Sequence, residues 1–242
     1  MFQRMYGWRA KIGLLVPSVN TTIEPDFWKL VPQGVSIHSA RLKTERLMTF
    51  DTLRDMEKST EDAAAQVADA QVDVIAYGCT SGSFFGGHEW NKQIVDKMEK
   101  KTGIPSLTTT DAMIHSLEEK KLKKISVVTP YVSKTNEQLK KYLNEGGIEV
   151  LDLKAFEILD GFDHANITPW QVYELVKKAD KPNAQGIFIA CTQVRALPVL
   201  GALEEDLKKP VISANQATLW LALKKLSFGG RIEGYGSLLL SF

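Results

Sequence analysis

Apolar residues in this chain gather in short continuous runs, separated by longer segments with helical spacing. Continuous apolar runs of this kind are typical of parallel strands that are buried on both faces of a sheet. Strands that alternate with helices predict parallel sheets with right-handed crossovers. We expect strands near residues 11–17, 34–40, 72–78, 104–108, 123–129, 147–154, 185–190 and 209–213.

Two of the helical segments between the runs are the clearest. One is expected to extend from Thr52 to Ala70 and the other from Thr168 to Ala179. In the second, Thr168 is placed to cap the helix and Pro169 occupies the first helical position, where its missing N–H costs nothing.

The eight runs form two sets of four that recur in the same order, about half a chain apart. This period is far longer than that of solenoid repeats, so it indicates a duplicated domain. We expect two Rossmann-like α/β halves, 1–118 and 119–242, related by a pseudo-twofold axis, each with a four-stranded parallel sheet flanked by helices. The tail from Gly229 to Phe242 has no counterpart and could pack back on the first half. The matching segments are Ile12–Asn20 with Ile125–Ser133, Gly34–Ile37 with Gly147–Val150, and Ile104–Leu107 with Lys209–Ile212.

The two cysteines of the chain occupy matching places in the two halves. Cys79 and Cys191 each end the third apolar run of their half, and each is followed by a threonine. A cysteine between a strand and a helix can have a lowered pKa and act as a nucleophile or a base. Free cysteine also packs well as a small buried hydrophobe, and a disulfide is a third reading. Two thiols in symmetric loops favour a site between the halves.

Ligands of open parallel sheets bind beyond the carboxyl ends of the strands. The loops at these positions carry hydroxyls and amides but little charge, which suits a carboxylate or a phosphate. Asn20 could instead cap a helix, a task that Thr21 or Thr22 could also perform. Tyr131 could be an ordinary half-buried aromatic, and Asn166 could simply shape a turn. The candidate binding residues are Asn20, Thr80, Ser81, Tyr131, Asn166 and Thr192.

Composition removes several functional classes. The net charge is +1, which gives no electrostatic case for nucleic acid or an anionic membrane. No apolar stretch approaches the roughly 20 residues that span a bilayer. The segment from Met1 to Lys11 lacks the apolar core of a leader, so we expect reduced thiols in the cytoplasm. Nucleotide fingerprints and metal-ligand spacings are missing too, so we expect no cofactor and no metal.

The set of motifs resembles the aspartate/glutamate racemase superfamily and, within it, the maleate cis-trans isomerases, with arylmalonate decarboxylases as close relatives. The resemblance covers nearly the whole chain. It rests on Val16–Thr22, Tyr77–Gly82, Val128–Tyr131, Ala190–Thr192 and Ser213–Ala217.

This resemblance implies an interfacial site, a cofactor-independent reaction and a homodimer or larger homo-oligomer. It assigns Cys79 as the nucleophile that adds to the substrate alkene, and Cys191 as the residue that handles a proton. Asn20, Tyr131 and Asn166 would hold the carboxylates. The decarboxylases carry only the second cysteine, so the presence of Cys79 argues against decarboxylation.

The chemistry of maleate fits two thiols. Rotation about its double bond requires loss of π character, which attack by a cysteine thiolate provides. Hydroxyl and amide donors would stabilise the charge that develops on the carboxylate. Two thiols could instead serve the two faces of a Cα–H in a racemase of aspartate or glutamate. A non-catalytic protein that binds a small carboxylate is the third possibility, and the expected ligand in every case is a small acid.

Overall fold

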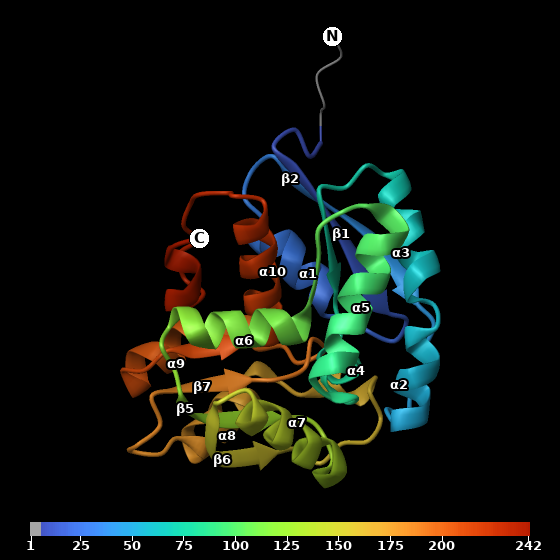
Figure 1. Ribbon diagram of the computed structural model, residues 1–242. Helices are drawn as coiled ribbons and strands as arrows, with labels where there is room; N and C mark the ends of the chain where they lie inside the picture. The colour runs from blue at the N-terminus through green and yellow to red at the C-terminus, as the bar shows by residue number, and fades with distance from the viewer. Residues whose placement is uncertain (1–5) are drawn as a thin grey trace.

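The computed structural model describes residues 6–242 and contains two four-stranded parallel sheets, which confirms the expected α/β class (Figure 1). The strand orders β2-β1-β3-β4 and β6-β5-β7-β8 match position for position. All eight expected strands are present, with ends that differ from expectation by a few residues. They are β1 Ala10–Pro17, β2 Val35–Leu42, β3 Val74–Tyr77, β4 Ser106–Thr108, β5 Lys124–Thr129, β6 Glu149–Ala155, β7 Gly186–Ile189 and β8 Val211–Ser213.

Helices connect the strands in both halves and cover the faces of the sheets (Figure 1). The expected helix with Thr168 as its cap and Pro169 in its first turn is α8. The α-helices are α1 Ile23–Leu30, α2 Phe50–Glu57, α3 Thr60–Asp69, α4 Thr80–Phe84, α5 Gly87–Thr102, α6 Thr109–Glu119, α7 Ser133–Glu145, α8 Pro169–Ala179, α9 Leu200–Leu207 and α10 Ala214–Lys225. Three short 3₁₀ turns are η1 Asp163–Asn166, η2 Leu197–Val199 and η3 Ser237–Leu240.

The helix expected over Thr52 to Ala70 is in fact two helices, α2 and α3. The first begins earlier, because Thr49 and Thr52 form a reciprocal capping box. It ends at Glu57, where the Ser59 hydroxyl donates to the Met56 carbonyl at 2.7 Å. Serine side chains compete in this way for backbone groups, so the break has a local cause that apolar spacing does not reveal.

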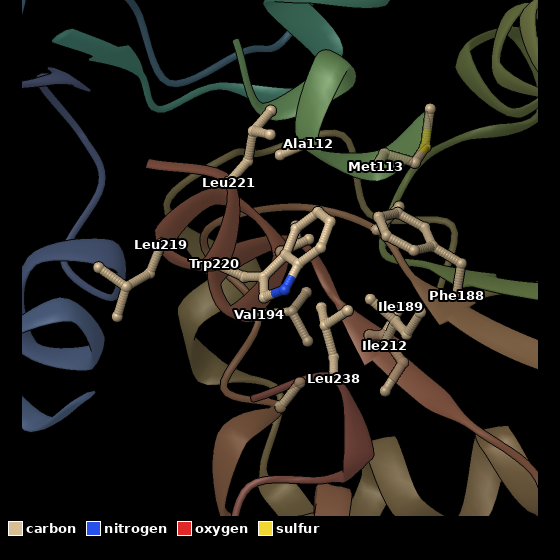
Figure 2. Packing of buried hydrophobic residues seen from close by; sticks show 14 of the residues in the cluster. Ala112, Met113, Phe188, Ile189, Val194, Ile212, Leu219, Trp220, Leu221 and Leu238 are labelled. Atoms are coloured by element: carbon tan, nitrogen blue, oxygen red, sulfur yellow. The ribbon is translucent and has the colours of Figure 1, made fainter. Parts of the chain in front are cut away.

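The two halves share one hydrophobic core. One cluster of buried residues extends from Ala10 in β1 to Leu239 in η3, and helix α6 of the first half packs against α10 of the second. Helix α10 is apolar or buried on every side from Ala214 to Leu223, as expected for a helix enclosed by neighbours. Figure 2 shows Trp220 of α10 surrounded by side chains of α6, β7, β8 and η3.

The tail from Gly229 to Phe242 packs mainly on its own half. The Glu204 carboxylate of α9 accepts hydrogen bonds from Ser237, and the Trp220 indole of α10 donates to the Ser241 carbonyl at 3.2 Å. Its contact with α1 of the first half is the Tyr235 ring, 5.5 Å from the Lys29 ammonium. We propose that the two halves divide near residue 118. Helix α6 ends next to that point and contacts elements of both halves.

The segment from Met1 to Lys11, expected to lack a leader, is only partly described, since Met1 to Met5 lie outside the described residues. Within residues 6–242, no helix combines the length and the apolar character that a bilayer crossing requires.

Candidate functional site

A pocket lies where the carboxyl ends of strands from both halves meet. Its empty volume, including the part open to solvent, is about 330 Å³. No Asp, Glu, Lys or Arg is among the described residues that form its wall. Seven of the eight site residues expected from sequence are brought together here. The lining residues are Pro17, Val19, Asn20, Met48, Cys79, Thr80, Ser81, Tyr131, Gly161, His164, Cys191, Thr192 and Gln193.

Cys79 follows β3 and is the N-cap of the short helix α4. Its sulfur accepts a hydrogen bond from the Gly82 N–H at 3.4 Å and lies 3.8 Å from the Ser81 hydroxyl. Burial raises the pKa of the Cys79 thiol, and the bonds from Gly82 and Ser81 oppose that rise without cancelling it. Cys79 therefore does not have the lowered pKa expected of a cysteine that opens a helix, because desolvation outweighs two neutral donors.

Cys191 occupies the matching place after β7 and has a strained backbone. Its φ is +84°, in the left-handed region that residues with a side chain rarely adopt. Its sulfur accepts from the Gln193 N–H at 3.4 Å and lies 3.6 Å from Nδ1 of His164. Burial raises the pKa of the Cys191 thiol to about 12, so this residue carries its proton at neutral pH.

Both cysteines are free, which excludes the disulfide reading. Burial raises the pKa of the Tyr131 hydroxyl, and the two thiols add to that rise, so Tyr131 lies within range of both sulfurs. That hydroxyl lies beside Cys191 and Thr80, but it and Oγ1 of Thr80 are buried and make no hydrogen bond of good geometry among the described residues. Unpaired buried donors are costly, and in a pocket they mark groups that a ligand can satisfy.

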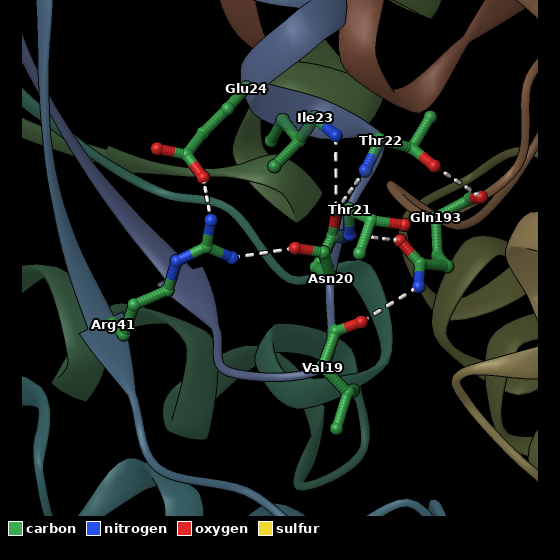
Figure 3. Close-up of polar contacts among 8 residues, drawn as sticks. All are labelled: Val19, Asn20, Thr21, Thr22, Ile23, Glu24, Arg41 and Gln193. Carbon is green, nitrogen blue, oxygen red and sulfur yellow. Dashed lines mark hydrogen bonds and ion pairs between the residues drawn. The ribbon is translucent and has the colours of Figure 1, made fainter.

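Asn20 caps a helix (Figure 3) and also links the two halves. Its Oδ1 accepts from the N–H groups of Thr22 at 2.9 Å and Ile23 at 3.0 Å, so it caps α1. Thr22 itself makes no side-chain cap, which corrects the idea that a threonine relieves Asn20 of that task. The Nδ2 of Asn20 donates to Oγ1 of Thr192 at 3.0 Å and retains a second N–H.

Gln193 fixes the first loop of the N-terminal half to the second cysteine loop (Figure 3). Its Oε1 accepts from the Thr21 N–H at 2.7 Å, and its Nε2 donates to the Val19 carbonyl at 2.9 Å. Its own carbonyl accepts from the Thr22 hydroxyl at 3.0 Å. Sequence reasoning did not select Gln193, although an amide two residues after the second cysteine was a visible signal.

Asn166 does not reach the pocket. Its Nδ2 donates to Oδ1 of Asp163 at 3.1 Å across the short η1 turn, and its carbonyl faces Arg195. The neighbouring His164 lines the pocket instead and is 2% exposed. In a 3₁₀ turn, residues two positions apart point in different directions, and that orientation decides between Asn166 and His164. His164 was not among the site residues predicted from sequence.

A clasp between the halves closes one side of the pocket; we define it as residues 46–48 together with 160–161. Leu47 and Asp160 form an antiparallel bridge, and the Gly161 N–H donates to the Arg46 carbonyl at 2.6 Å. The Arg46 guanidinium pairs with the Asp160 carboxylate at 2.7 Å. A Cβ at Gly161 would come within 2.6 Å of the Met48 side chain, so this glycine allows the close approach.

The described part of the chain holds no cluster of three or more His, Cys, Asp or Glu side chains that could bind a metal ion. The polar groups that line the pocket are two thiols, several hydroxyls, two amides and one imidazole. Such a set can add to an electron-poor double bond, move a proton and hydrogen-bond a carboxylate.

The chain is similar to maleate isomerases in both sequence and fold. Maleate isomerase of Geobacillus stearothermophilus is 30% identical, with 95% of this chain and 96% of the relative covered. A variant of maleate isomerase Iso from Pseudomonas putida S16, solved with maleate, has a TM-score of 0.91 at 29% identity over 95% of this chain and 97% of the other. A Nocardia farcinica maleate cis-trans isomerase mutant with a covalent succinylcysteine intermediate has a TM-score of 0.90 at 25% identity, covering 96% and 98%.

The family comparison covers almost the whole chain. The model of the arylmalonate decarboxylase family matches residues 12–239, which includes both cysteine loops and the complete pocket. The chain belongs to the arylmalonate decarboxylase family.

Proposed function

We propose that this protein is an isomerase that converts maleate to fumarate through a covalent adduct on Cys79. The observation that carries this proposal is the pair of free thiols, one from each half, in one pocket without charged side chains. Relatives that are 29–30% identical to this chain are maleate isomerases, and one solved neighbour holds a succinylcysteine intermediate. A saturated four-carbon adduct on sulfur is the product expected when a thiol adds across the double bond of maleate.

The reaction begins when Cys79, as a thiolate, attacks one alkene carbon. The Sγ–C bond forms, the π bond breaks, and its electron pair moves toward the neighbouring carboxylate. The unpaired hydroxyls of Tyr131 and Thr80 can donate to that carboxylate, and the free N–H of Asn20 can hold a carboxylate too.

Cys191 is suited to supply the proton. Its pKa of about 12 keeps the thiol protonated, so it can donate to the carbon next to the new Sγ–C bond. The two carbons are then joined by a single bond and can rotate. Return of the proton to Cys191 and loss of Cys79 give the trans alkene, which is fumarate.

Two alternatives predict different products. A decarboxylase of aryl malonates leaves Cys79 without a role, since one proton donor suffices for that reaction. A racemase of aspartate or glutamate binds an ammonium group, and among the described residues no carboxylate lines the pocket to pair with it. A non-catalytic binder gives no product at all.

We propose further that the enzyme works without a cofactor in the cytoplasm as a homodimer or larger homo-oligomer. Neither nucleic acid nor a membrane is expected as a partner. The near-neutral net charge supports this, as no strong field would draw the molecule to an anionic surface.

The test combines proton NMR with intact-mass measurement. Wild type incubated with maleate in D₂O should form fumarate, and quenched samples should carry one added dicarboxylic acid. Cys79→Ala should show neither, while Cys191→Ala should retain the adduct and lose turnover by about 10²–10⁴-fold. Deuterium at Cα of one enantiomer of aspartate or glutamate, with no fumarate from maleate, would replace this proposal with a racemase.

A further inference from the structure

The imidazole of His164 is held so that one nitrogen faces Cys191. Its Nε2 lies 3.0 Å from the Ile158 carbonyl oxygen, which can only accept a hydrogen bond, so Nε2 carries the ring hydrogen. In a neutral imidazole the lone pair is then on Nδ1, which lies 3.6 Å from Sγ of Cys191. The Cys191 thiol is therefore positioned to donate its hydrogen to Nδ1 of His164.

The groups around His164 come from four places in the fold. The edge of the Tyr131 ring packs against it at a centroid distance of 5.9 Å, and Cys191 faces it from the second cysteine loop. Asp160 and Asp163 act on it from its own loop, and both carboxylates are paired with Arg46 of the clasp, at 2.7 Å and 3.9 Å. Burial lowers the pKa of His164, while the bond to the Ile158 carbonyl and the two carboxylates oppose this, so the ring is neutral and has acidic neighbours.

The proposed isomerisation requires two thiolates, one on Cys79 before addition and one on Cys191 after it. Cys79 must lose its proton before it attacks, although burial favours the neutral thiol. When Cys191 has given its proton to carbon, a thiolate remains beside a bound dianion. A thiolate in that position has a high free energy unless a cation or a strong donor faces it.

We propose that His164 is the proton-sharing partner of Cys191: it accepts the proton that Cys79 releases, by way of solvent, and stabilises the Cys191 thiolate formed after proton transfer. This rests on the proposed isomerase function. The protonated ring donates Nδ1–H to the Cys191 sulfur, so that the S–H of Cys191 is free to point at the substrate. In the addition step the Sγ–C bond to Cys79 forms, the π bond breaks, and the Cys191 proton becomes the new C–H.

The proton count is conserved through the cycle. Before addition the site holds a Cys79 thiolate, a Cys191 thiol and a His164 imidazolium, the same number of protons as two thiols and a neutral ring. After addition it holds the thioether, the Cys191 thiolate and the imidazolium as an ion pair. Elimination returns the C–H proton to Cys191, breaks the Sγ–C bond and restores the starting state.

A purely structural role for His164 predicts different behaviour. A ring that only fills space and holds the Ile158 carbonyl would affect stability but not the reactivity of Cys191. The Gln193 N–H and the Tyr131 hydroxyl also act on this sulfur, but neither group is a base at neutral pH, so neither can take the thiol proton in place of the imidazole.

The first test measures the reactivity of Cys191 without substrate. In a Cys79→Ser background, iodoacetamide should alkylate Cys191 at least about ten-fold more slowly at pH 7 when His164→Asn or His164→Gln is added, because no base takes the thiol proton. With His164 intact, the rate of Cys191 alkylation should rise with pH as the imidazole loses its proton. His115→Asn is the matched control, since that ring also contacts a backbone carbonyl but lies exposed on α6, away from the pocket.

The second test measures turnover of maleate in the otherwise wild-type protein. His164→Asn should lower kcat by about 10²-fold while KM changes less than about three-fold, because the step affected is proton transfer. An alkylation rate that His164→Asn leaves unchanged overturns the proposal whatever happens to turnover. If wild type forms no fumarate but alkylation still depends on His164, the Cys191–His164 pair stands and the proposed isomerase function fails.

Discussion

At the scale of single residues, the pocket combines two thiols from matching loops with several hydroxyls and one imidazole. Cys79 and Cys191 both line it, one from each half, as their matching places in the sequence predicted. Asn166 and His164 lie two residues apart, and only the direction of the η1 turn decides which one enters the pocket. Side-chain direction in an irregular loop has no periodicity, so a sequence pattern cannot supply it.

The unpaired hydroxyl of Tyr131 leads to a prediction in which stability and activity separate. Tyr131→Phe removes a buried oxygen that has no partner, so the free energy of unfolding should stay constant or rise by up to about 1 kcal/mol. Loss of a donor to the substrate carboxylate should lower kcat/KM by roughly ten- to a hundred-fold. Urea unfolding and steady-state kinetics measure the two effects.

Tyr77→Phe is the matched control for that experiment. Its hydroxyl is also buried without a partner, but Tyr77 does not line the pocket. It should show the same small effect on stability and less than a three-fold change in kcat/KM. A drop in stability for Tyr131→Phe alone would mean that its hydroxyl supports the fold rather than the ligand.

The positive φ of Cys191 predicts an order of stability between two variants. Both Cys191→Gly and Cys191→Ala remove the thiol, but only glycine adopts a φ of +84° without strain. Strain of this kind costs about 1–3 kcal/mol, and the greater freedom of glycine in the unfolded chain offsets part of that. Cys191→Gly should therefore be about 1 kcal/mol more stable than Cys191→Ala in urea unfolding, and equal stability would show that the loop relaxes.

At the scale of secondary structure, the apolar runs predicted the strands. Polar side chains explain the helix ends that these runs did not predict. All eight strands appear because buried parallel strands are apolar on both faces. The break between α2 and α3 has no glycine or proline to announce it, and depends on the Ser59 hydroxyl. Polar residues also repeat between the halves, since Asp111 of α6 and Gln216 of α10 are the third residues of equivalent capping boxes.

These two capping boxes give a comparison between equivalent helices. Ser213→Ala should destabilise the protein by about 1 kcal/mol, the usual cost of losing a cap. Thr108→Ala should cost more, because the Thr108 hydroxyl also donates to Asn91 at 2.6 Å and its removal leaves a buried acceptor unpaired. Thermal and urea unfolding of both variants test the order, and a larger loss for Ser213→Ala would contradict this account.

At the scale of the whole molecule, the two halves form one body because polar and apolar contacts cross between them. The duplication predicted paired halves, but which residues join them could not be predicted, as those contacts depend on how the two sheets are placed. Asn215 of α10 shows this well. Its Nδ2 donates to Asp26 of α1 in the first half at 2.7 Å and to the carbonyl of Thr192 at 3.1 Å, next to Cys191.

The Asp26–Asn215 contact makes the stability of this joint depend on pH. Burial raises the pKa of Asp26 to about 6 from a usual value of 3.8, while the bond from Asn215 and the charge of Lys29 pull it down. The folded protein therefore binds the Asp26 proton more tightly than the unfolded chain does. The stabilisation that this proton provides is complete below about pH 4 and is lost as pH rises through about 6.

Replacing the carboxyl by an uncharged amide tests this dependence directly. Relative to wild type, Asp26→Asn should gain on the order of 2 kcal/mol in the free energy of unfolding between pH 4 and pH 8, because only wild type must bury a charge at the higher pH. Lys29→Gln removes the cation that favours the charged carboxylate, so it should move the transition to higher pH. Urea titrations across this range measure both effects. A difference between wild type and Asp26→Asn that does not vary with pH would show that Asp26 stays ionised in the folded protein, with the bond from Asn215 sufficient to hold its charge.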